Sequence, residues 1–304
     1  MDRHVPVLLT EVIETLNLKK GLQVVDCTLG DAGHSEMILE KIGPSGKLLG
    51  IDADTESLLR AKLNLYRFES QVVFVHGNFA DLQKILNEKH ITSVDRILMD
   101  LGWSTPQFAE RGRGFSFALS EPLDMRYGTK FDEGYATAAD IINTADQEEL
   151  VTIFKRYGEE DLSKEIASAI VEQRKSTPIE ETNELVEIIL NVYRSKLKST
   201  KEIPWIGGLH PATKVFQALR IAVNHELEVL EQALPQAVAA LGSGGRLAVI
   251  SFHSLEDRIV KHFFQSLSSK EFKIITKKPL VASDEELAKN APSRSAKLRV
   301  IEKI

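Results

Sequence analysis

The chain has almost no cysteine and no long apolar run. Cys27 is the only cysteine among 304 residues, which excludes an internal disulfide and a zinc site built from cysteines. A metal site would need histidine and carboxylate ligands alone, and we expect none. No apolar stretch approaches the roughly 20 residues that cross a bilayer, and the charged segment MDRHVPVLLTEV is unlike a signal peptide. These absences predict a cytoplasmic protein without a membrane segment.

Positive charge is also scarce. The 38 Lys and Arg residues are outnumbered by 44 Asp and Glu residues, which gives a formal net charge of -6. Binding along any nucleic acid depends on neutralising phosphates, so the composition argues against a protein that coats nucleic acid. A local basic surface remains open, as does the alternative of scattered solvated charges. The candidates are Arg111, Arg113, Arg174, Lys175, Lys277, Lys278, Arg294, Lys297 and Arg299.

Short apolar runs rich in β-branched residues predict a parallel sheet. The runs span residues 22–29, 47–52, 71–77, 94–102 and 244–252. Helical patterns separate them, and strands that alternate with helices form parallel sheets. FKIITKK and KLRVIEKI close the chain as two further strands, expected to pair antiparallel across a short connection. The sequence therefore predicts a mostly parallel α/β sheet.

The chain between the fourth and fifth runs contains helical patterns only. They span residues 137–158, 159–175 and 182–197, with Thr182 as the expected N-cap of the third. The Gly- and Pro-rich segment KEIPWIGGLHP then leads back, and one long helix is expected from Pro211, with an apolar face that continues to Leu234. We infer a helical substrate-recognition domain, residues 103–209, inserted into a domain formed by residues 1–102 and 210–304.

The loop after the first strand indicates which nucleotide binds there. Its sequence, Gly30-Asp31-Ala32-Gly33-His34, lacks the three-glycine spacing of a dinucleotide-binding loop. Asp26 and Asp31 are expected to flank the place of a pyrophosphate, where like charges repel. S-adenosylmethionine (SAM) has no phosphate, and its ammonium and sulfonium groups gain from nearby carboxylates. The loop therefore predicts SAM.

Polar residues follow the predicted strands at one edge of the sheet. Asp52 lies 19 residues after Gly33, close to the offset of about 20 at which a carboxylate binds ribose hydroxyls. Phe79 is expected to stack on adenine, Asp81 to cap a helix, and Asp100 to lie at the switch point of the sheet. Each aspartate alone also fits a helix cap. The set at successive strand ends favours a ligand site.

Two histidines lie beside predicted helix starts. The stretch Ser254-Leu-Glu-Asp257 fits a capping box, which leaves His253 without a capping role. His34 opens the helix after the glycine loop, where its backbone N–H is the group expected to bind.

The chain contains the blocks HVPVLLTEV, DCTLGDAGHS, GIDAD, DLGWSTPQF, RGFSF, PLDMR, YGEE, HPATKVFQALRIAVNHEL and SFHSLEDRIVK. Together they resemble the signature blocks of one bacterial family, the ribosomal small-subunit methyltransferase H family, also called MraW. The match runs nearly end to end. The resemblance implies a class I SAM-dependent methyltransferase, with a Rossmann-like, mostly parallel seven-stranded sheet and a helical insert. It also implies methylation of the exocyclic N4 of a cytidine in the decoding centre of 16S rRNA, on the small ribosomal subunit.

The resemblance also implies site residues. SAM contacts fall on Ala32, Gly33, His34, Asp52, Phe79, Asp100 and Gln107. The chain departs from the family at three positions, with Ala32 in place of glycine, Trp103 in place of valine and Thr105 in place of serine. Alanine costs little unless the position needs a positive φ or a close ligand approach. Trp103 bears on the pocket for the target base.

We expect Asp100 to stabilise the positive charge that develops on the target amine. The alternative is that Asp100 contacts only the cofactor. The target cytidine must be unstacked to react, and splayed RNA is bound by stacking and by cations. Phe115 and Phe117 lie among the candidate residues, or pack into the core of the insert. The RNA-facing candidates are Trp103, Arg111, Arg113, His253 and Arg258.

Three other functions remain open at this point. They are a SAM-dependent enzyme that acts on DNA or a small molecule, a non-catalytic assembly factor that keeps SAM as a structural ligand, and a nicotinamide-dependent oxidoreductase. The sequence also leaves open whether the protein is a monomer or a homodimer.

Overall fold

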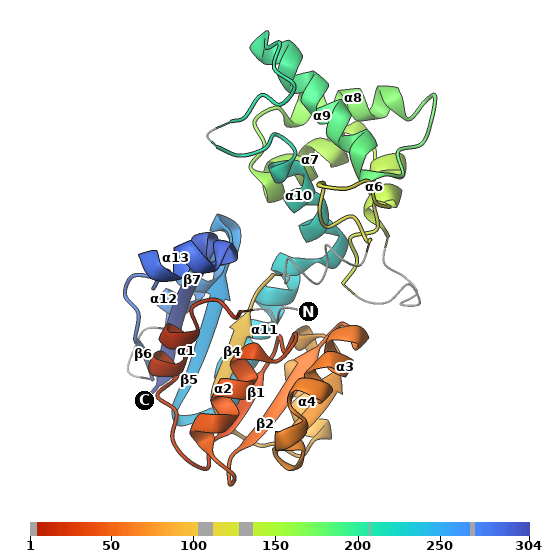
Figure 1. Cartoon of the computed structure of the whole chain (residues 1–304). Coiled ribbons are helices and arrows are strands. Elements are labelled where there is room, and N and C mark those ends of the chain that lie inside the picture. Colours follow the sequence, from red (N-terminus) through yellow and green to blue (C-terminus); the bar gives the residue numbers. More distant parts are fainter. Residues whose placement is uncertain (1–4, 103–111, 128–135, 207, 268–270) are drawn as a thin grey trace. The chain divides into compact units, whose positions relative to one another are not determined.

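A seven-stranded sheet forms the first of two units in the computed structural model of the chain (Figure 1). This unit comprises Met1–Ser104 and Leu227–Ile304, and the second comprises Thr105–Glu226. The structure describes residues 5–102, 112–127, 136–206, 208–267 and 271–304. Among these residues no helix combines the length and the apolar character that a membrane span requires.

The strand order is β3-β2-β1-β4-β5-β7-β6. Strands β1 to β5 pair in parallel, and β7 runs antiparallel to both of its neighbours. The arrangement confirms the predicted Rossmann-like fold with a mostly parallel seven-stranded sheet. The strands are β1 (Gln23–Asp26), β2 (Lys47–Asp52), β3 (Val72–His76), β4 (Val94–Asp100), β5 (Leu241–Ser251), β6 (Phe272–Ile274) and β7 (Lys297–Lys303).

The last two strands pair as predicted, but their connection is long. It contains α13 (Asp284–Lys289) and the 3-10 helix η3 (Ala291–Ser295). This connection also holds the N-terminal segment, because a Glu286 carboxylate oxygen accepts from the Leu8 N–H at 2.8 Å. Because residues 275–296 separate the two strands, the expectation of a short connection is wrong.

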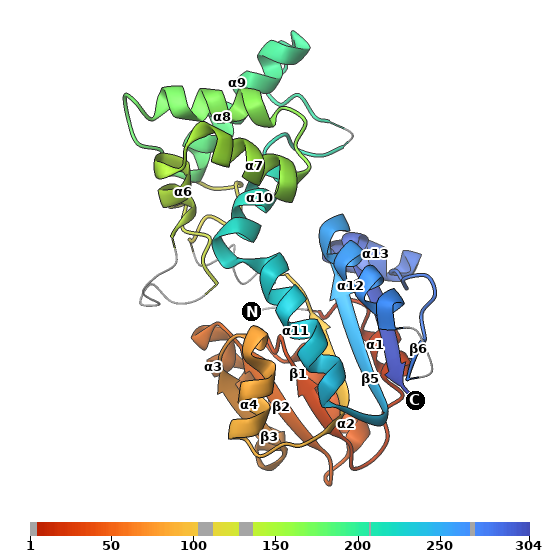
Figure 2. The same ribbon diagram turned by 180° about the vertical axis from the view of Figure 1, so that it is seen from behind.

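Helices cover both faces of the sheet, as Figures 1 and 2 show from opposite sides. Successive strand residues point to opposite faces, so Val24 packs in one core and Val25 in the other. Helices α1 (Leu9–Leu16), α2 (Gly33–Ile42) and α3 (Thr55–Asn64) pack in the first core. Helices α4 (Leu82–Glu88), α11 (Glu226–Ala240) and α12 (Ser254–Leu267) pack in the second.

The second unit has its own helical core, which includes the buried side chains of Phe154, Ile166, Leu185 and Phe216. Thr182 is not the N-cap of its helix. Glu181 occupies that position, and the buried Thr182 hydroxyl instead donates to the Leu119 carbonyl oxygen at 2.8 Å. The helices are α6 (Ala138–Thr144), α7 (Gln147–Gly158), α8 (Ser163–Gln173), α9 (Thr182–Leu197) and α10 (Thr213–Asn224).

The long helix expected from Pro211 is two helices. His225 has φ 50°, in the left-handed region, and it separates α10 from α11. The apolar spacing continues across this break, so periodicity alone does not reveal it. Because α10 packs in the core of the second unit, the division between the units falls after Glu226 rather than before His210.

Candidate active site

Three aspartates end neighbouring parallel strands at one edge of the sheet. Asp26 ends β1, Asp52 ends β2 and Asp100 ends β4. Strand β1 lies between the other two, and the connections diverge on either side of it. Ligands of open α/β sheets bind in the crevice at such a switch point. The predicted strand-end residues are therefore brought together.

The glycine loop is fastened to the end of β2 by two hydrogen bonds. The Leu29 N–H donates to the Ile51 carbonyl oxygen at 2.9 Å, and the Gly30 N–H donates to Asp52 at 2.7 Å. Gly30 has φ 53°, which suits a residue without a side chain. A Cβ on Gly33 would meet the ring of Pro6 at 3.1 Å, so the N-terminal segment packs against the loop.

Ala32 adopts the backbone conformation that glycine tolerates best. Its φ is 64°, its ψ is 30°, and it immediately precedes α2. The residue is fully buried. The departure from the family's glycine therefore falls at a position that does need a positive φ, and it carries the backbone strain that alanine has there.

This strain predicts the effect of a larger side chain. We expect Ala32→Val to lower the free energy of unfolding by roughly 2 to 4 kcal/mol, because a β-branched residue is strained at positive φ and the site is fully buried. Ala32→Gly should stay within about 1 kcal/mol of the parent, since relief of strain offsets the lost methyl burial. Urea denaturation measures both. A valine variant as stable as the glycine variant would refute the strain.

Asp52 is a buried acceptor with spare capacity. One oxygen accepts from the Gly30 N–H at 2.7 Å, and the other accepts from the Asp54 N–H at 2.8 Å. Burial raises the pKa of Asp52 to about 6, against the opposing effect of these two hydrogen bonds. Each carboxylate oxygen can accept a second hydrogen bond. Asp52 can therefore bind two hydroxyl donors once it is ionised.

The other two acidic residues of the loop region have protein partners. Asp26 accepts from the Ser35 hydroxyl at 2.6 Å and from the Thr28 N–H at 3.1 Å, and burial raises its pKa. Asp31 pairs with Arg60, with 2.8 Å between Oδ1 and Nε. The Arg60 partner therefore offsets the charge that Asp31 was expected to place beside a pyrophosphate. Asp26 holds the loop onto the start of α2.

Asp100 and His34 form a pair at the switch point. His34 is 6% exposed, and its Nδ1 lies 3.5 Å from Oδ2 of Asp100. Its Nε2 lies 2.9 Å from the Val7 carbonyl oxygen. That oxygen can only accept, so Nε2 carries a proton, and in the neutral ring Nδ1 is an acceptor directed at Asp100. The N-terminal segment therefore sets the tautomer of His34.

One oxygen of Asp100 has no donor among the residues that the structure describes. Oδ1 is buried and accepts no hydrogen bond from the described residues, while the Asp100 N–H donates to the Thr28 hydroxyl at 2.7 Å. Burial, and then the negative charges of Asp26 and Glu256, raise the pKa of Asp100 well above its usual value. A buried acceptor without a donor costs free energy, which a bound donor would recover.

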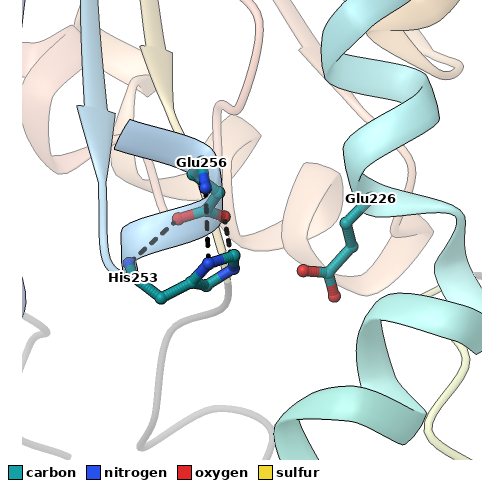
Figure 3. A group of neighbouring side chains, drawn as sticks. All are labelled: Glu226, His253 and Glu256. Carbon is teal, nitrogen blue, oxygen red and sulfur yellow. Dashed lines mark hydrogen bonds and ion pairs between the residues drawn. The ribbon is translucent and has the colours of Figure 1, made fainter. Parts of the chain in front are cut away.

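His253 and Glu256 form a second pair beyond the end of β5 (Figure 3). His253 Nε2 lies 3.3 Å from Oε1 of Glu256, and Oε2 accepts from the Phe252 N–H at 2.8 Å. Figure 3 also draws Glu226, which belongs to the second unit and there pairs with Arg220 at 2.8 Å.

The predicted capping box at Ser254 and Asp257 is displaced by one residue. His253 precedes the helix, and Glu256 accepts backbone N–H groups at its start. Asp257 instead pairs with Arg299, with 2.6 Å between Oδ1 and Nε. Arg258, one of the RNA-facing candidates, lies exposed on the same helix.

The remaining candidates of the first unit lie in two places. Phe79 begins the 3-10 helix η2 (Phe79–Asp81) and packs half-buried against the core under β2 and β4. Asn78 caps that helix, and the Asp81 side chain makes no capping bond to α4, so the predicted cap is wrong. Trp103, Gln107 and Arg111 lie outside the described residues.

The aromatic candidates of the second unit belong to its interior. Phe115 is buried and stacks on Tyr127 with 5.6 Å between ring centroids. Phe117 packs on Phe216 at 5.0 Å. Arg113 is partly buried and donates to the Tyr127 carbonyl oxygen at 3.3 Å. The alternative that the two phenylalanines pack in the insert is therefore confirmed.

The side chain of His34 and the hydroxyl of Thr28 are site residues that the sequence did not reveal. Both act on Asp100, which lies more than sixty positions later in the chain. No periodicity reports such long-range contacts. The only available signal was the resemblance of the blocks that contain Val7, Thr28 and His34.

Comparisons with known proteins agree over the whole chain. The model of a family described as the MraW methylase family matches residues 1–304. The ribosomal RNA small subunit methyltransferase H of Clostridium botulinum is 46% identical over 318 residues, covering 99% of this chain and of that protein. That of Clostridioides difficile is 43% identical over 317 residues, with the same coverage. A solved rRNA methylase of Streptococcus thermophilus, 9% identical, covers 99% of each chain with a TM-score of 0.47.

Proposed function

The chain belongs to the MraW methylase family, and on that premise we propose that it transfers a methyl group from SAM to the exocyclic N4 of a cytidine in 16S rRNA. The proposed target lies in the decoding centre, and the substrate is the small ribosomal subunit. The names of the relatives support small-subunit rRNA as the target class. The resemblance of the signature blocks supports the nucleotide and the nitrogen. A ribosomal substrate also implies that the protein works in the cytoplasm.

The described residues fit SAM by their hydrogen-bonding capacity. Asp52 can accept from the two ribose hydroxyls, since each of its oxygens has a second acceptor position. The backbone from Ala32 to His34 opens α2, where the first N–H groups have no partner within the helix. Phe79 would stack on adenine, and Asp100 would receive a donor at Oδ1. Gln107 is the seventh proposed contact. SAM supplies an electrophilic methyl group on a sulfonium.

The amine of cytosine is a poor nucleophile, because its lone pair is conjugated with the ring. The residues around it must fix its orientation and take up its proton. As the bond from N4 to the methyl carbon forms, the bond from sulfur to that carbon breaks, and N4 loses one proton. We assign that proton to Asp100. Burial raises the pKa of Asp100, so its carboxylate is more basic than that of an ordinary aspartate.

His34 prepares Asp100 for this role. Its Nε2–H is used by the Val7 carbonyl oxygen, which leaves Nδ1 directed at Oδ2 of Asp100. Once Asp100 has taken the proton from N4, its carboxyl can donate to the Nδ1 acceptor, so His34 stabilises the protonated form of Asp100. The observation that carries the proposed reaction is this pair at the switch point, with one carboxylate oxygen lacking a protein donor among the described residues.

The substrate class is tested by a transfer assay with tritiated SAM. Unmethylated small subunits, free 16S rRNA, DNA and cytidine are offered separately. We expect label in the subunits and little in protein-free RNA, since an acidic chain gains little from phosphate charge alone and recognition of assembled shape must supply the rest. Label in DNA or cytidine would favour another methyltransferase. Calorimetry with NAD in place of SAM tests the oxidoreductase alternative.

Asp52 predicts how SAM affinity depends on pH. Its raised pKa, about 6, keeps the carboxyl protonated below that pH, and the acceptor form prevails above it. Hydroxyl donors favour the ionised form, so affinity should fall as the pH drops, by about tenfold between pH 7 and pH 5. Calorimetry at several pH values measures this. Asp52→Asn should bind more weakly at pH 7 and lose the pH dependence, whereas a wild-type affinity that is flat in this range would contradict the assignment.

A further inference from the structure

The segment between α9 and α10, in the second unit, exposes a cluster of large apolar side chains. Trp205 is 60% exposed, Leu209 is 51% exposed and Ile206 is 38% exposed. We call these three residues the Trp205 surface. Exposed apolar residues scattered singly need no explanation, but a group in one short segment marks a binding site. Folding gains little from a tryptophan that remains mostly in water.

The segment that carries this surface is held in place by hydrogen bonds. Ile206 and Leu209 exchange backbone hydrogen bonds at 3.0 and 2.9 Å, which forms an isolated antiparallel bridge. The Trp205 N–H donates to the Ile203 carbonyl oxygen at 3.1 Å. Arg194 of α9 donates to the Glu202 carbonyl oxygen from Nε at 3.0 Å. The exposed side chains are therefore presented on a fixed backbone.

A row of aromatic rings connects Trp205 to the core of the unit. Trp205 meets His210 edge to face, with 5.6 Å between ring centroids. His210 stacks on Phe117 at 4.7 Å, and Phe117 meets Phe216 at 5.0 Å. Burial lowers the pKa of His210, so its ring is neutral at pH 7 and provides an uncharged support. His210 thus supports the indole ring on one side, while most of Trp205 remains exposed to solvent.

The same segment is locally basic in an acidic chain. From Arg194 to Lys214 there are five Lys and Arg residues and one acidic residue, Glu202. Two of the five, Lys198 and Lys201, are exposed and form no ion pair with any described residue. Lys196, by contrast, pairs with Glu165 at 2.9 Å. The segment that contains Trp205 therefore carries an excess of positive charge.

We propose that the Trp205 surface binds single-stranded RNA, with a base stacked on the indole ring and phosphates near Lys198 and Lys201. This inference deepens the proposed function and rests on it for the identity of the substrate. A rigid aromatic ring beside cations is the combination that binds unpaired nucleotides with little sequence preference. A protein partner would also use a tryptophan, but it would not explain the excess of positive charge in this segment.

Steady-state kinetics with unmethylated small subunits provide the first test. Trp205→Ala should raise KM for the subunit about tenfold, while Trp205→Phe, which keeps an aromatic ring, should raise it less than threefold. Leu119→Ala is the matched control, because Leu119 is an equally exposed apolar residue of the same unit, 69% exposed, outside this segment. SAM affinity by calorimetry verifies that each variant is folded. An unchanged KM in Trp205→Ala would overturn the proposal.

Fluorescence provides a second test that does not remove Trp205. The chain has two tryptophans, so Trp103→Phe leaves Trp205 as the only one. A short single-stranded oligocytidylate should quench its emission on binding at low salt. Replacing Lys198 and Lys201 with alanine should reduce the slope of log affinity against log salt by about 0.7 for each phosphate that the protein no longer neutralises.

The outcomes separate RNA from protein, and the surface from the reaction. A raised KM in Trp205→Ala, combined with no quenching by oligocytidylate, would assign the surface to a ribosomal protein and overturn the RNA proposal. Quenching by oligocytidylate in a protein that transfers no methyl group to any RNA would uphold the surface and refute the proposed function. Methyl transfer with neither effect would uphold the function and refute the surface.

Discussion

Asp100→Asn should reduce methyl transfer to the small subunit by about 10³-fold, because the amide cannot take the proton that N4 loses. General base groups contribute roughly 10²- to 10⁴-fold, and the buried carboxylate of Asp100 is the group at the switch point with an oxygen that lacks a donor among the described residues. Single-turnover kinetics at saturating SAM isolate this step. The affinity for SAM should fall by no more than about tenfold, since asparagine retains the volume and one acceptor oxygen.

The control for this variant is Asp284→Asn, which changes an exposed carboxylate of α13 in the same unit and should leave the rate unchanged. A rate in Asp100→Asn within tenfold of the parent would reduce Asp100 to a cofactor contact. Loss of methylation with SAM still bound would count against the non-catalytic assembly factor, because such a protein has no transfer to lose.

His34→Gln should reduce the same rate by about a hundredfold and move its pH dependence. His34 is a positioning residue, which acts through Asp100 by way of the contact between Nδ1 and Oδ2. Asp100 accepts a proton only when it is ionised, so the parent enzyme should lose activity as the pH falls. The negative charges of Asp26 and Glu256 act on Asp100, and His34 faces it with Nδ1. The Nδ1 acceptor of neutral His34 favours the protonated form of Asp100, so its removal should move the acid limb to lower pH.

A purely structural role for His34 would lower the rate without moving the pH profile. The pH profile therefore distinguishes the two roles, and SAM affinity at pH 7 checks that the glycine loop remains folded. A His34→Gln enzyme with a parental pH profile would contradict the shared proton between Asp100 and His34.

The strand positions were predictable because burial leaves a direct mark on a sequence. Each parallel strand is covered on both faces, so its residues form a short apolar run, and the residue that follows the run lies at the edge of the sheet. Asp52 and Asp100 were found in this way, and the structure places them at the ends of β2 and β4, the two strands that flank β1. The family resemblance added His34 and Gln107, which periodicity does not reveal.

The wrong predictions have two physical causes. In one case a single backbone angle ended a helix, and in the others a partner distant in the sequence determined what a side chain contacts. His225 turns into the left-handed region without interrupting the apolar spacing around it. Asp31 has an arginine partner 29 positions later, and Asp257 has one 42 positions later. The choice between Ser254 and His253 as the residue before α12 depends on which side chains reach the first N–H groups. Local patterns carry none of this information.

Nucleoside analysis of the product determines whether N4 of a cytidine receives the methyl group. Unmethylated small subunits are labelled with tritiated SAM, the 16S rRNA is digested to nucleosides, and the radioactive nucleoside is identified by chromatography against standards. We predict that the label co-elutes with N4-methylcytidine and is absent from the Asp100→Asn reaction. Label in 5-methylcytidine or in another nucleoside would refute methyl transfer to N4. Absence of label from the 16S rRNA, although the protein binds SAM, would refute it as well.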